Sequence, residues 1–259
     1  MVSSKETKVP TILEANINPP NPKSKPQSPV PGARVGRLTS ALRRAAFGLW
    51  HARIRSSLGR PDRVSLLGFD LVVAPGVLNP RHFRTSRVLA AYVAGLDLNN
   101  QRVADIGTGS GLAALAAARA GARVTAVDID PVAVECASQN AARTGLAARI
   151  QVVRSNVWEA VDPTLRFDLV ISNPPFYPRD AEGPQDQAFA AGADYSFFTR
   201  LADGLGHRLA AHGSLVLVHS SDVPIAEIAG RMRTVGLSLH PLRERRGFFE
   251  TLSLNEFKA

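Results

Sequence analysis

The sequence predicts an α/β fold of the doubly wound, Rossmann-like type, in which a mostly parallel sheet carries helices on both faces. The first observation is that short apolar strands and helices alternate from residue 102 to the end of the chain. The second is a glycine-rich turn between the first of these strands and the helix that follows it. The third is a pair of adjacent strands at the end of the chain, which predicts a terminal antiparallel hairpin.

The first 60 residues are expected to stand apart from this fold. Residues 1–33 contain seven prolines and no periodic apolar pattern, so we expect a disordered Pro-rich tail. Residues 34–60 form the next segment, and a basic amphipathic helix is expected between residues 36 and 58. Its apolar side chains at helical spacing are Leu38, Leu42, Ala45, Leu49 and Ile54. Such a helix could dock on the body of the protein, on RNA or on a membrane surface.

The net charge of +9 lies wholly in this N-terminal region. Residues 1–33 hold four Lys and two acids, and residues 34–63 hold eight Arg and one acid. Residues 64–259 hold 19 basic and 19 acidic side chains, so the rest of the chain is neutral. A basic arm of this kind suits a polyanion, most simply RNA or a ribosome, although a solubilising or targeting segment would look the same.

Residues 61–100 are expected to lead into the main domain. The stretch Asp62 to Val73 is rich in Val, Leu and Phe and is broken at Gly68, which predicts a small β-hairpin. A loop rich in Pro and Gly follows at residues 74–79. A helix is then expected over residues 84–96.

Residues 101–259 are expected to form the main α/β domain. Strands are expected at residues 102–106, 123–127, 150–153, 167–172, 214–219, 237–242 and 248–254, and helices at residues 112–120, 131–144, 197–211 and 225–235. Gly121 ends the first of these helices at a left-handed position. Asp130 and Pro131 are an N-cap and a first-turn proline that begin the second helix.

Composition excludes several classes of protein. A single cysteine excludes an internal disulfide framework and a cysteine-rich metal site, and favours a reducing compartment. No apolar run approaches the roughly 18 residues that span a bilayer, and residues 1–31 lack the apolar centre of a signal peptide. We therefore expect a cytoplasmic protein. The six histidines have no metal-ligand spacing, so no metal site is predicted, and Trp158 is interpreted as a packing residue.

The first candidate site is the turn Asp105-Ile106-Gly107-Thr108-Gly109-Ser110-Gly111. Glycines there allow a sharp turn and the close approach of a ligand. The dinucleotide fingerprint is G-x-G-x-x-G, but here the third glycine comes one residue early. The G-x-G-x-G spacing is typical of the loop that holds S-adenosylmethionine, which has no pyrophosphate. The Asp105 carboxylate would repel phosphate but attract the ammonium group of a methionine moiety. We assign Asp105, Gly107, Thr108, Gly109 and Gly111 to cofactor binding.

An acidic residue follows the second strand of this domain. Asp128 lies 21 residues after Gly107, where a carboxylate can accept hydrogen bonds from both ribose hydroxyls. Ile129 beside it is assigned to the same site. After the next strand, Asn156 is placed to bond the adenine and Val157 to pack against it, although a loop Asn can equally serve the turn itself.

The second candidate site is the element Asn173-Pro174-Pro175-Phe176, directly after the strand at residues 167–172. Two prolines end the hydrogen-bond ladder of the strand and fix a rigid turn. The Asn173 side-chain oxygen and the Pro174 carbonyl can then accept hydrogen bonds from a substrate –NH2 group and orient its lone pair. Phe176 can stack on a flat amide or base. Catalysis would rest on positioning and electrostatics, without a strong general base.

These residues together resemble a known family. Asp105–Gly111, Asp128 and Asn173–Phe176 are similar to class I S-adenosylmethionine-dependent methyltransferases of the release-factor glutamine methyltransferase type. They also resemble the small-domain ribosomal RNA methyltransferases that act on exocyclic base amines. The resemblance covers roughly residues 75–255, including residues 191–194 and 250–253.

The resemblance implies both a fold and a division of roles. The fold would be a seven-stranded sheet, mostly parallel, with its last strand antiparallel. Asn173 and Pro174 would bind the target nitrogen, with Asn173 also bordering the cofactor. The cofactor would be S-adenosylmethionine, held by Asp105, the loop glycines, Asp128 and Asn156.

The expected reaction is methyl transfer to a planar nitrogen, most simply a protein glutamine amide in a release factor or ribosomal protein. An exocyclic amine of an RNA base and a small-molecule amine remain alternatives. Phe176 stands where the glutamine enzymes usually carry Tyr, and residues 80–85 lack the acid that usually follows their Pro-Arg pair. A nicotinamide-dependent oxidoreductase and a non-catalytic RNA-binding relative fit these motifs less well.

Overall fold

The computed structural model describes residues 59–259, except residues 184–185, 222 and 247–250. The tail expected at residues 1–33 and the basic helix expected between residues 36 and 58 lie outside the described residues.

The described chain begins with a two-stranded hairpin. Strands β1 (Asp62–Leu66) and β2 (Phe69–Val73) pair antiparallel, as the sequence predicts, with Leu67 and Gly68 at positive φ in the turn. Helix α2 (Arg84–Val93) follows and ends three residues before the expected end. Its buried face packs on the main sheet and on the next helix.

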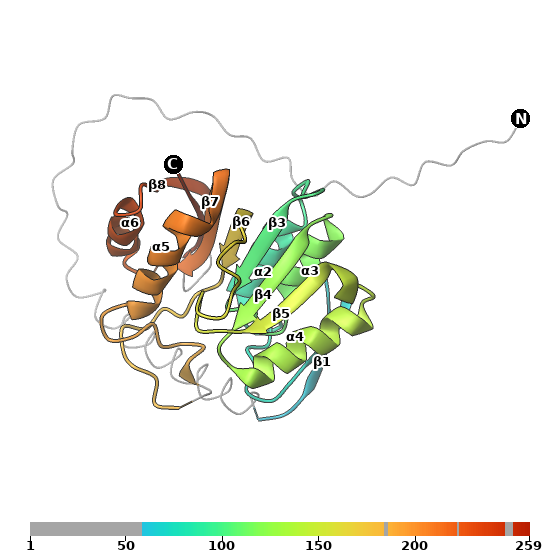
Figure 1. Cartoon of the computed structure of the whole chain (residues 1–259). Helices are drawn as coiled ribbons and strands as arrows, with labels where there is room; N and C mark the ends of the chain where they lie inside the picture. The colour runs from blue at the N-terminus through green and yellow to red at the C-terminus, as the bar shows by residue number, and fades with distance from the viewer. Residues whose placement is uncertain (1–58, 184–185, 222, 247–250) are drawn as a thin grey trace, which may run out of the picture. The chain divides into compact units, whose positions relative to one another are not determined.

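The main domain is a seven-stranded sheet with the order β5-β4-β3-β6-β7-β9-β8 (Figure 1). The strands are β3 (Arg102–Ile106), β4 (Arg123–Asp128), β5 (Ile150–Arg154), β6 (Phe167–Ser172), β7 (Leu209–Ser220), β8 (Ser238–Arg246) and β9 (Thr251–Lys258). All neighbouring pairs from β5 to β7 are parallel, whereas β9 lies antiparallel between β7 and β8. The predicted fold class is confirmed, including the antiparallel last strand.

Helices cover both faces of this sheet. The helices after α2 are α3 (Leu112–Arg119), α4 (Pro131–Arg143), α5 (Ser196–Arg208) and α6 (Ile225–Arg233), with a short 3-10 turn, η1, at Ala147–Arg149. Helices α2 and α3 enclose one apolar core with the sheet, and α5 and α6 enclose the other (Figure 1). Helix α3 buries almost its whole length because small alanine side chains allow it to approach the sheet closely.

Two sets of predicted boundaries are wrong. The helix expected to reach residue 211 ends at Arg208, and β7 begins at Leu209, because the chain pairs with β6 there. The register of that pair shifts between Phe167 and Leu169, so alanines that favour a helix are held in an irregular extended segment. At the end of the chain, β8 runs on to Arg246, because charged side chains are well tolerated on an exposed edge strand. Strand β9 covers Thr251–Lys258 instead of residues 248–254.

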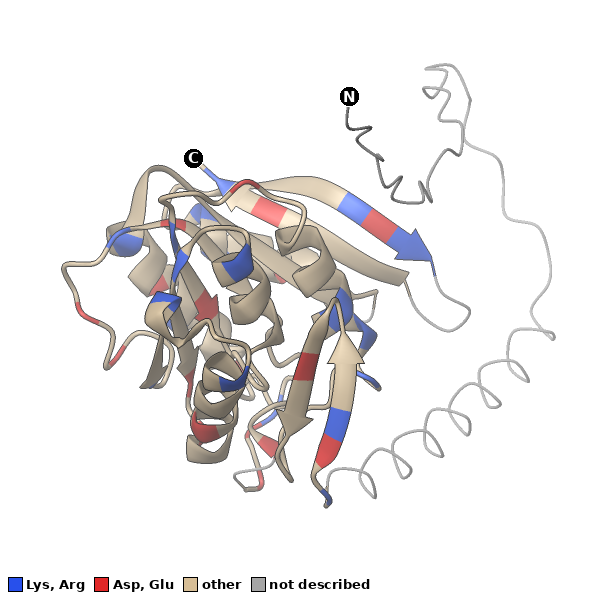
Figure 2. Ribbon diagram, turned by 90° about the vertical axis from the view of Figure 1, so that its right-hand side faces the viewer, with Lys and Arg blue, Asp and Glu red and all other residues tan. Residues whose placement is uncertain are grey.

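Charges of both signs are interspersed over the described domain, including the β8–β9 edge (Figure 2). Among the residues that the structure describes, no helix is long and apolar enough to cross a membrane.

Candidate active site

The candidate residues meet where the order of the sheet reverses. The chain runs outward from β3 through β4 to β5 and then returns to the other side of β3 as β6. The loops after β3 and β6 therefore diverge and leave a crevice at the carboxyl ends of the strands, which is where open α/β sheets bind ligands. Register places Ile106 beside Ser172, and the Ser172 hydroxyl donates to the Ile106 carbonyl at 2.7 Å. The glycine loop and the Asn-Pro-Pro turn are therefore fixed side by side.

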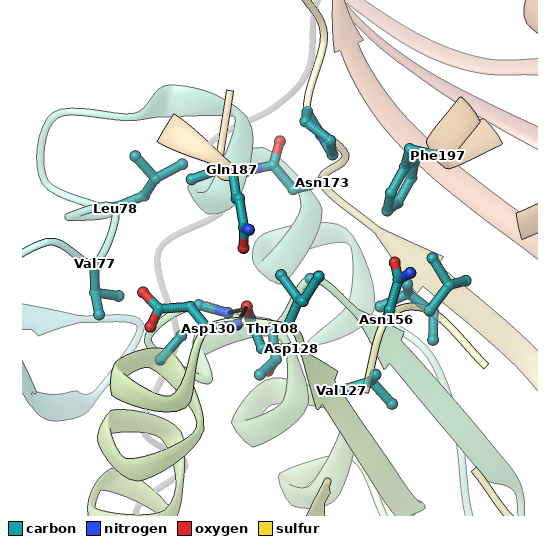
Figure 3. A pocket seen from close by; sticks show the side chains of 18 of the residues that line it. Val77, Leu78, Thr108, Val127, Asp128, Asp130, Asn156, Asn173, Gln187 and Phe197 are labelled. Carbon is teal, nitrogen blue, oxygen red and sulfur yellow. Dashed lines mark hydrogen bonds between the residues drawn. The ribbon is translucent and has the colours of Figure 1, made fainter. Parts of the chain in front are cut away.

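A cavity of about 290 Å³ occupies this crevice. Its lining includes most of the residues that the sequence singles out: Asp105, Gly107, Thr108, Gly109, Asp128, Ile129, Asn156, Val157, Asn173 and Pro175. Gly111 caps α3 just behind the cavity, and an added Cβ there would meet the Cα of Ala137 at 3.3 Å. Figure 3 shows Thr108, Asp128 and Asp130 on one side of the cavity and Asn173 and Phe197 on the other.

The glycine loop has the backbone that its composition requires. Gly107, Gly109 and Gly111 have φ of 78°, 55° and 83°. Side chains other than glycine rarely adopt these values. A Cβ added at Gly107 would come no nearer than 4.0 Å to protein outside the loop, and the same holds at Gly109. The space in front of these two residues is therefore open to a ligand.

Asp105 lies buried beneath this loop. One of its carboxylate oxygens accepts hydrogen bonds from the Thr108 hydroxyl at 2.7 Å and from the Ala114 amide at 3.1 Å. Burial raises the pKa of the Asp105 carboxyl to about 7, the hydrogen bond from Thr108 opposes this rise, and the Asp128 carboxylate adds to it. A cation in the cavity would therefore stabilise the charged form of Asp105.

Asp128 supports the glycine loop from the end of β4. Its carboxylate accepts the Gly109 amide at 2.9 Å and the Asp130 amide at 3.1 Å. Burial also raises the pKa of the Asp128 carboxyl. Asp130 accepts the Val132 amide at 2.9 Å and caps α4, which confirms the N-cap prediction.

The loop after β5 completes this side of the cavity. The Asn156 side-chain amide donates to a Glu159 carboxylate oxygen at 2.7 Å. Val157 follows with φ of 55° and is buried. Asn156 therefore serves the local turn and also lines the cavity, so both interpretations made from the sequence remain compatible with its position.

Asn173 lies opposite the glycine loop. Its Nδ2 atom donates to the hydroxyl of Ser86 in α2 at 3.1 Å. Its Oδ1 atom is buried and has no hydrogen-bond partner within the described structure. A buried acceptor without a donor is costly, and such atoms are rare in folded proteins. This oxygen is thus available to a donor on a ligand.

The structure separates the other members of the Asn-Pro-Pro-Phe turn. Pro175 lines the cavity, whereas Pro174 is buried. Phe176 is not among the lining residues, and its side chain packs against the core formed with α5 and α6. The aromatic ring that lines the cavity belongs instead to Phe197 in α5 (Figure 3).

Described residues between positions 176 and 192 also line the cavity, among them Asp180, Gln187 and Ala190. The Phe176 and Tyr177 amides both donate to the Phe189 carbonyl, and the Arg179 guanidinium forms a bidentate ion pair with Asp186. The Phe189 ring also contacts Phe83, at 5.9 Å between centroids, in the loop before α2. Through Phe189, these residues therefore contact the start of α2, which also supplies Ser86.

The cavity wall also contains residues that were not identified from the sequence, among them Ser86, Gln187, Phe197 and Arg200. Phe197 and Arg200 lie in a helix whose apolar spacing indicated only a packing face. Ser86 and Gln187 have no sequence signal, because their place at the site depends on contacts between distant parts of the chain.

Comparisons with known proteins agree with this geometry. The model of the methyltransferase small domain family matches residues 70–248. The chain belongs to this family. The match confirms the prediction of a methyltransferase domain of the S-adenosylmethionine-dependent class.

The names of the relatives of this chain state different methyl acceptors. A release factor glutamine methyltransferase of Moorella thermoacetica is 36% identical over 156 residues, which are 57% of this chain and 54% of that protein. A tRNA1(Val) (adenine(37)-N6)-methyltransferase of Porphyromonas gingivalis is 34% identical over 148 residues, 53% of this chain and 58% of that protein. The chain spans about half the length of the curated relatives it matches.

Solved structures share the fold. The 16S rRNA N2 G1207 methyltransferase of T. Thermophilus, solved with AdoMet and guanosine, has a TM-score of 0.56 at 23% identity. The match covers 77% of this chain and 50% of that chain. At this level of identity the likeness shows the methyltransferase fold alone.

Proposed function

We propose that this protein transfers a methyl group from S-adenosylmethionine to a planar nitrogen, and that the acceptor is the side-chain amide of a protein glutamine. The observation that carries the proposal is the Asn173 Oδ1 atom, which is buried in a residue of the cavity wall and has no hydrogen-bond partner among the described residues. A primary amide or amine supplies the N–H donor that this atom lacks. The named relatives include release factor glutamine methyltransferases, which supports the choice of acceptor.

The glycine-loop side of the cavity fits the cofactor. The open space in front of Gly107 and Gly109 accepts a ligand that approaches the backbone closely. We propose that Asp105 binds its ammonium group, that Asp128 binds its ribose, and that Asn156 borders its adenine. Thr108, Gly111, Ile129 and Val157 complete this half of the proposed site. When bound, S-adenosylmethionine supplies an electrophilic methyl group on a sulfonium.

The Asn-Pro-Pro turn fits the acceptor. We propose that Asn173 Oδ1 and the Pro174 carbonyl accept the two N–H groups of the target nitrogen, while Pro175 keeps the turn rigid. The two acceptors orient the nitrogen lone pair and stabilise the positive charge that develops on the nitrogen. An amide nitrogen is a poor nucleophile, so this orientation supplies much of the acceleration.

The proposal is tested with methyl-labelled S-adenosylmethionine and a lysate from source cells that lack the gene. The Asn173→Ala variant serves as the blank, after calorimetry has shown that it still binds S-adenosylhomocysteine. We expect label in the precipitate that protease removes and ribonuclease does not, and a glutamine as the labelled residue. Equal labelling by Asn173→Ala would contradict the proposed mechanism.

A second candidate is an exocyclic amine of an RNA base. It is favoured by the Phe197 ring in the cavity wall, because aromatic rings stack on flat bases. Relatives named as tRNA adenine methyltransferases support the same candidate. Removal of the label by ribonuclease alone would select it, and a contribution of the basic arm at residues 34–63 would then be measured by the salt dependence of RNA binding. Label in neither fraction would indicate a small-molecule acceptor.

A further inference from the structure

The side-chain amide of Asn173 is held at one end only. Its Nδ2 atom donates to the Ser86 hydroxyl at 3.1 Å, whereas its Oδ1 atom is buried without a partner. The two residues are 87 positions apart in the chain, and both line the cavity. Within the described residues, the Ser86 hydroxyl thus makes the one side-chain hydrogen bond to the amide of the proposed acceptor-binding residue.

The orientation of this amide decides what it can bind. An asparagine amide has a carbonyl oxygen that accepts and an NH2 group that donates, and rotation by half a turn exchanges them. The last side-chain torsion of asparagine is broad and roughly two-fold, so local geometry sets the orientation weakly. With NH2 facing the acceptor site, two donors would oppose each other and a target –NH2 group could not bind.

We propose that Ser86 is a positioning residue that holds the Asn173 amide with its oxygen toward the target nitrogen. This inference rests on the proposed function, because it concerns the acceptor half of that site. When the target nitrogen donates to Oδ1, the Nδ2 group requires an acceptor on its other side. The Ser86 hydroxyl meets that requirement at hydrogen-bond distance.

The surroundings of Ser86 make it a fixed point. It lies in the first turn of α2, whose Leu89, Ala90 and Val93 are buried against the apolar core. A hydroxyl on such a helix moves little relative to the sheet that carries Asn173. The Asn173 backbone is in turn fixed by the rigid turn after β6. The Ser86–Asn173 hydrogen bond therefore joins two well-anchored elements, helix α2 and the turn after β6.

The first experiment compares Ser86→Ala, Ser86→Thr and Thr85→Ala in methyl transfer by the full chain. Ser86→Ala removes the hydroxyl, Ser86→Thr keeps it, and Thr85→Ala removes a hydroxyl from the neighbouring position of the same helix. We expect Ser86→Ala to lower kcat about tenfold or more, which corresponds to about 1.4 kcal/mol or more of lost transition-state stabilisation. Ser86→Thr should recover most of that loss, and Thr85→Ala should remain within about twofold of wild type.

Cofactor binding serves as the internal control of this experiment. Because Ser86 acts through Asn173 on the acceptor, the Kd for S-adenosylhomocysteine should change less than about twofold in Ser86→Ala. A loss of activity that matched a loss of S-adenosylhomocysteine binding would assign Ser86 to the cofactor instead and overturn the proposal. Wild-type kcat in Ser86→Ala, with Asn173→Ala inactive, would overturn the role of Ser86 alone. Full activity in Asn173→Ala would overturn the proposed function itself.

A second experiment detects the Ser86–Asn173 hydrogen bond by NMR in the absence of any methyl acceptor. The side-chain NH2 signals of Asn173 are assigned in a 15N-labelled protein by their disappearance in Asn173→Ala. We expect these protons to exchange with solvent faster, and to shift, in Ser86→Ala but not in Thr85→Ala, with recovery in Ser86→Thr. Identical shifts and exchange rates in wild type and Ser86→Ala would show that the hydroxyl does not hold the amide.

Discussion

The side-chain amide of Asn140 in α4 pairs with the backbone of Val72 in β2 as a neighbouring strand would. The Val72 amide donates to Asn140 Oδ1, and Asn140 Nδ2 donates to the Val72 carbonyl, both at 2.9 Å. The same Nδ2 donates to the Ser110 carbonyl of the glycine loop at 2.9 Å. One fully buried side chain thus joins the hairpin, α4 and the glycine loop.

Asn140→Ala should lower the free energy of unfolding by about 3 kcal/mol, because it removes three hydrogen bonds. The Val72 amide and the Ser110 carbonyl lose this partner, whereas the Val72 carbonyl keeps the Cys136 thiol at 3.3 Å. The matched control is Gln139→Ala, which removes an exposed side chain from the next position of the same helix and should change stability by less than about 0.5 kcal/mol. Denaturant titration of both variants measures the difference. Equal stability of the two would show that these hydrogen bonds contribute little.

Gly204→Ala should be strongly destabilising although it lies in a helix. An added Cβ would come within 2.0 Å of Cδ1 in Trp158, whose indole Nε1 donates to the Leu201 carbonyl at 3.1 Å. We expect a loss of about 3 kcal/mol from overpacking and from the displaced indole. Gly206→Ala in the same helix meets only Val235 at 3.6 Å and should be neutral or stabilising by about 0.5 kcal/mol. Thermal and denaturant unfolding of the pair tests this contrast, and a Gly204→Ala protein as stable as Gly206→Ala would refute it.

Phe197→Leu should reduce acceptor turnover more than Phe176→Leu does. Both rings pack partly against the same core, but only Phe197 lines the cavity. Leucine keeps most of the apolar packing in each case and removes the flat face that stacks on an amide or base. We expect kcat/KM for the acceptor to be about tenfold lower in Phe197→Leu than in Phe176→Leu. The reverse order would restore the sequence-based assignment of the aromatic contact to Phe176.

Local patterns made much of the fold, and the meeting of several candidate residues at one cavity, predictable. Asp105 lies near the end of β3, the loop glycines follow that strand, and Asp128 ends β4. Parallel strands bring their carboxyl ends to one edge of the sheet. The Asp130 N-cap likewise depends on neighbours in sequence. These features needed no knowledge of how distant segments pack.

Contacts between distant segments could not be predicted in the same way. Ser86 meets Asn173 across 87 positions, and Asn140 meets Val72 across 68. The Phe176 side chain packs against the core formed with α5 and α6, and the hydrogen bonds from the Phe176 and Tyr177 amides to the Phe189 carbonyl have no periodic signature in the sequence. Gly204 could be interpreted only as a weak point in a helix until the position of Trp158 was known.

Cofactor binding should become tighter as the pH rises through about 7, because the Asp105 carboxyl has a raised pKa of about 7 in the free protein. A carboxyl group whose pKa is higher in the folded than in the unfolded protein contributes most to the stability of the folded, ligand-free protein at pH values below its unfolded-state pKa. That contribution is lost as the pH rises from about 3.8 to about 7, where burial opposes ionisation. An ammonium group beside Asp105 favours the carboxylate, so binding of S-adenosylhomocysteine should release a proton near pH 6.5.

Calorimetry in buffers of different ionisation enthalpy counts this proton. We expect the Kd for S-adenosylhomocysteine to fall between pH 6 and pH 8 in the wild type. Asp105→Asn should bind S-adenosylhomocysteine more weakly and lose most of the pH dependence of binding. The small pH dependence that remains would come from Asp128, whose carboxyl pKa is also raised by burial. Glu135→Gln, which neutralises an exposed carboxylate of α4 that does not line this cavity, is the matched control and should keep the wild-type proton release. Asp105→Asn removes only the carboxylate that is proposed to bind the ammonium group. Unchanged proton release in this variant would therefore show that another group titrates on binding.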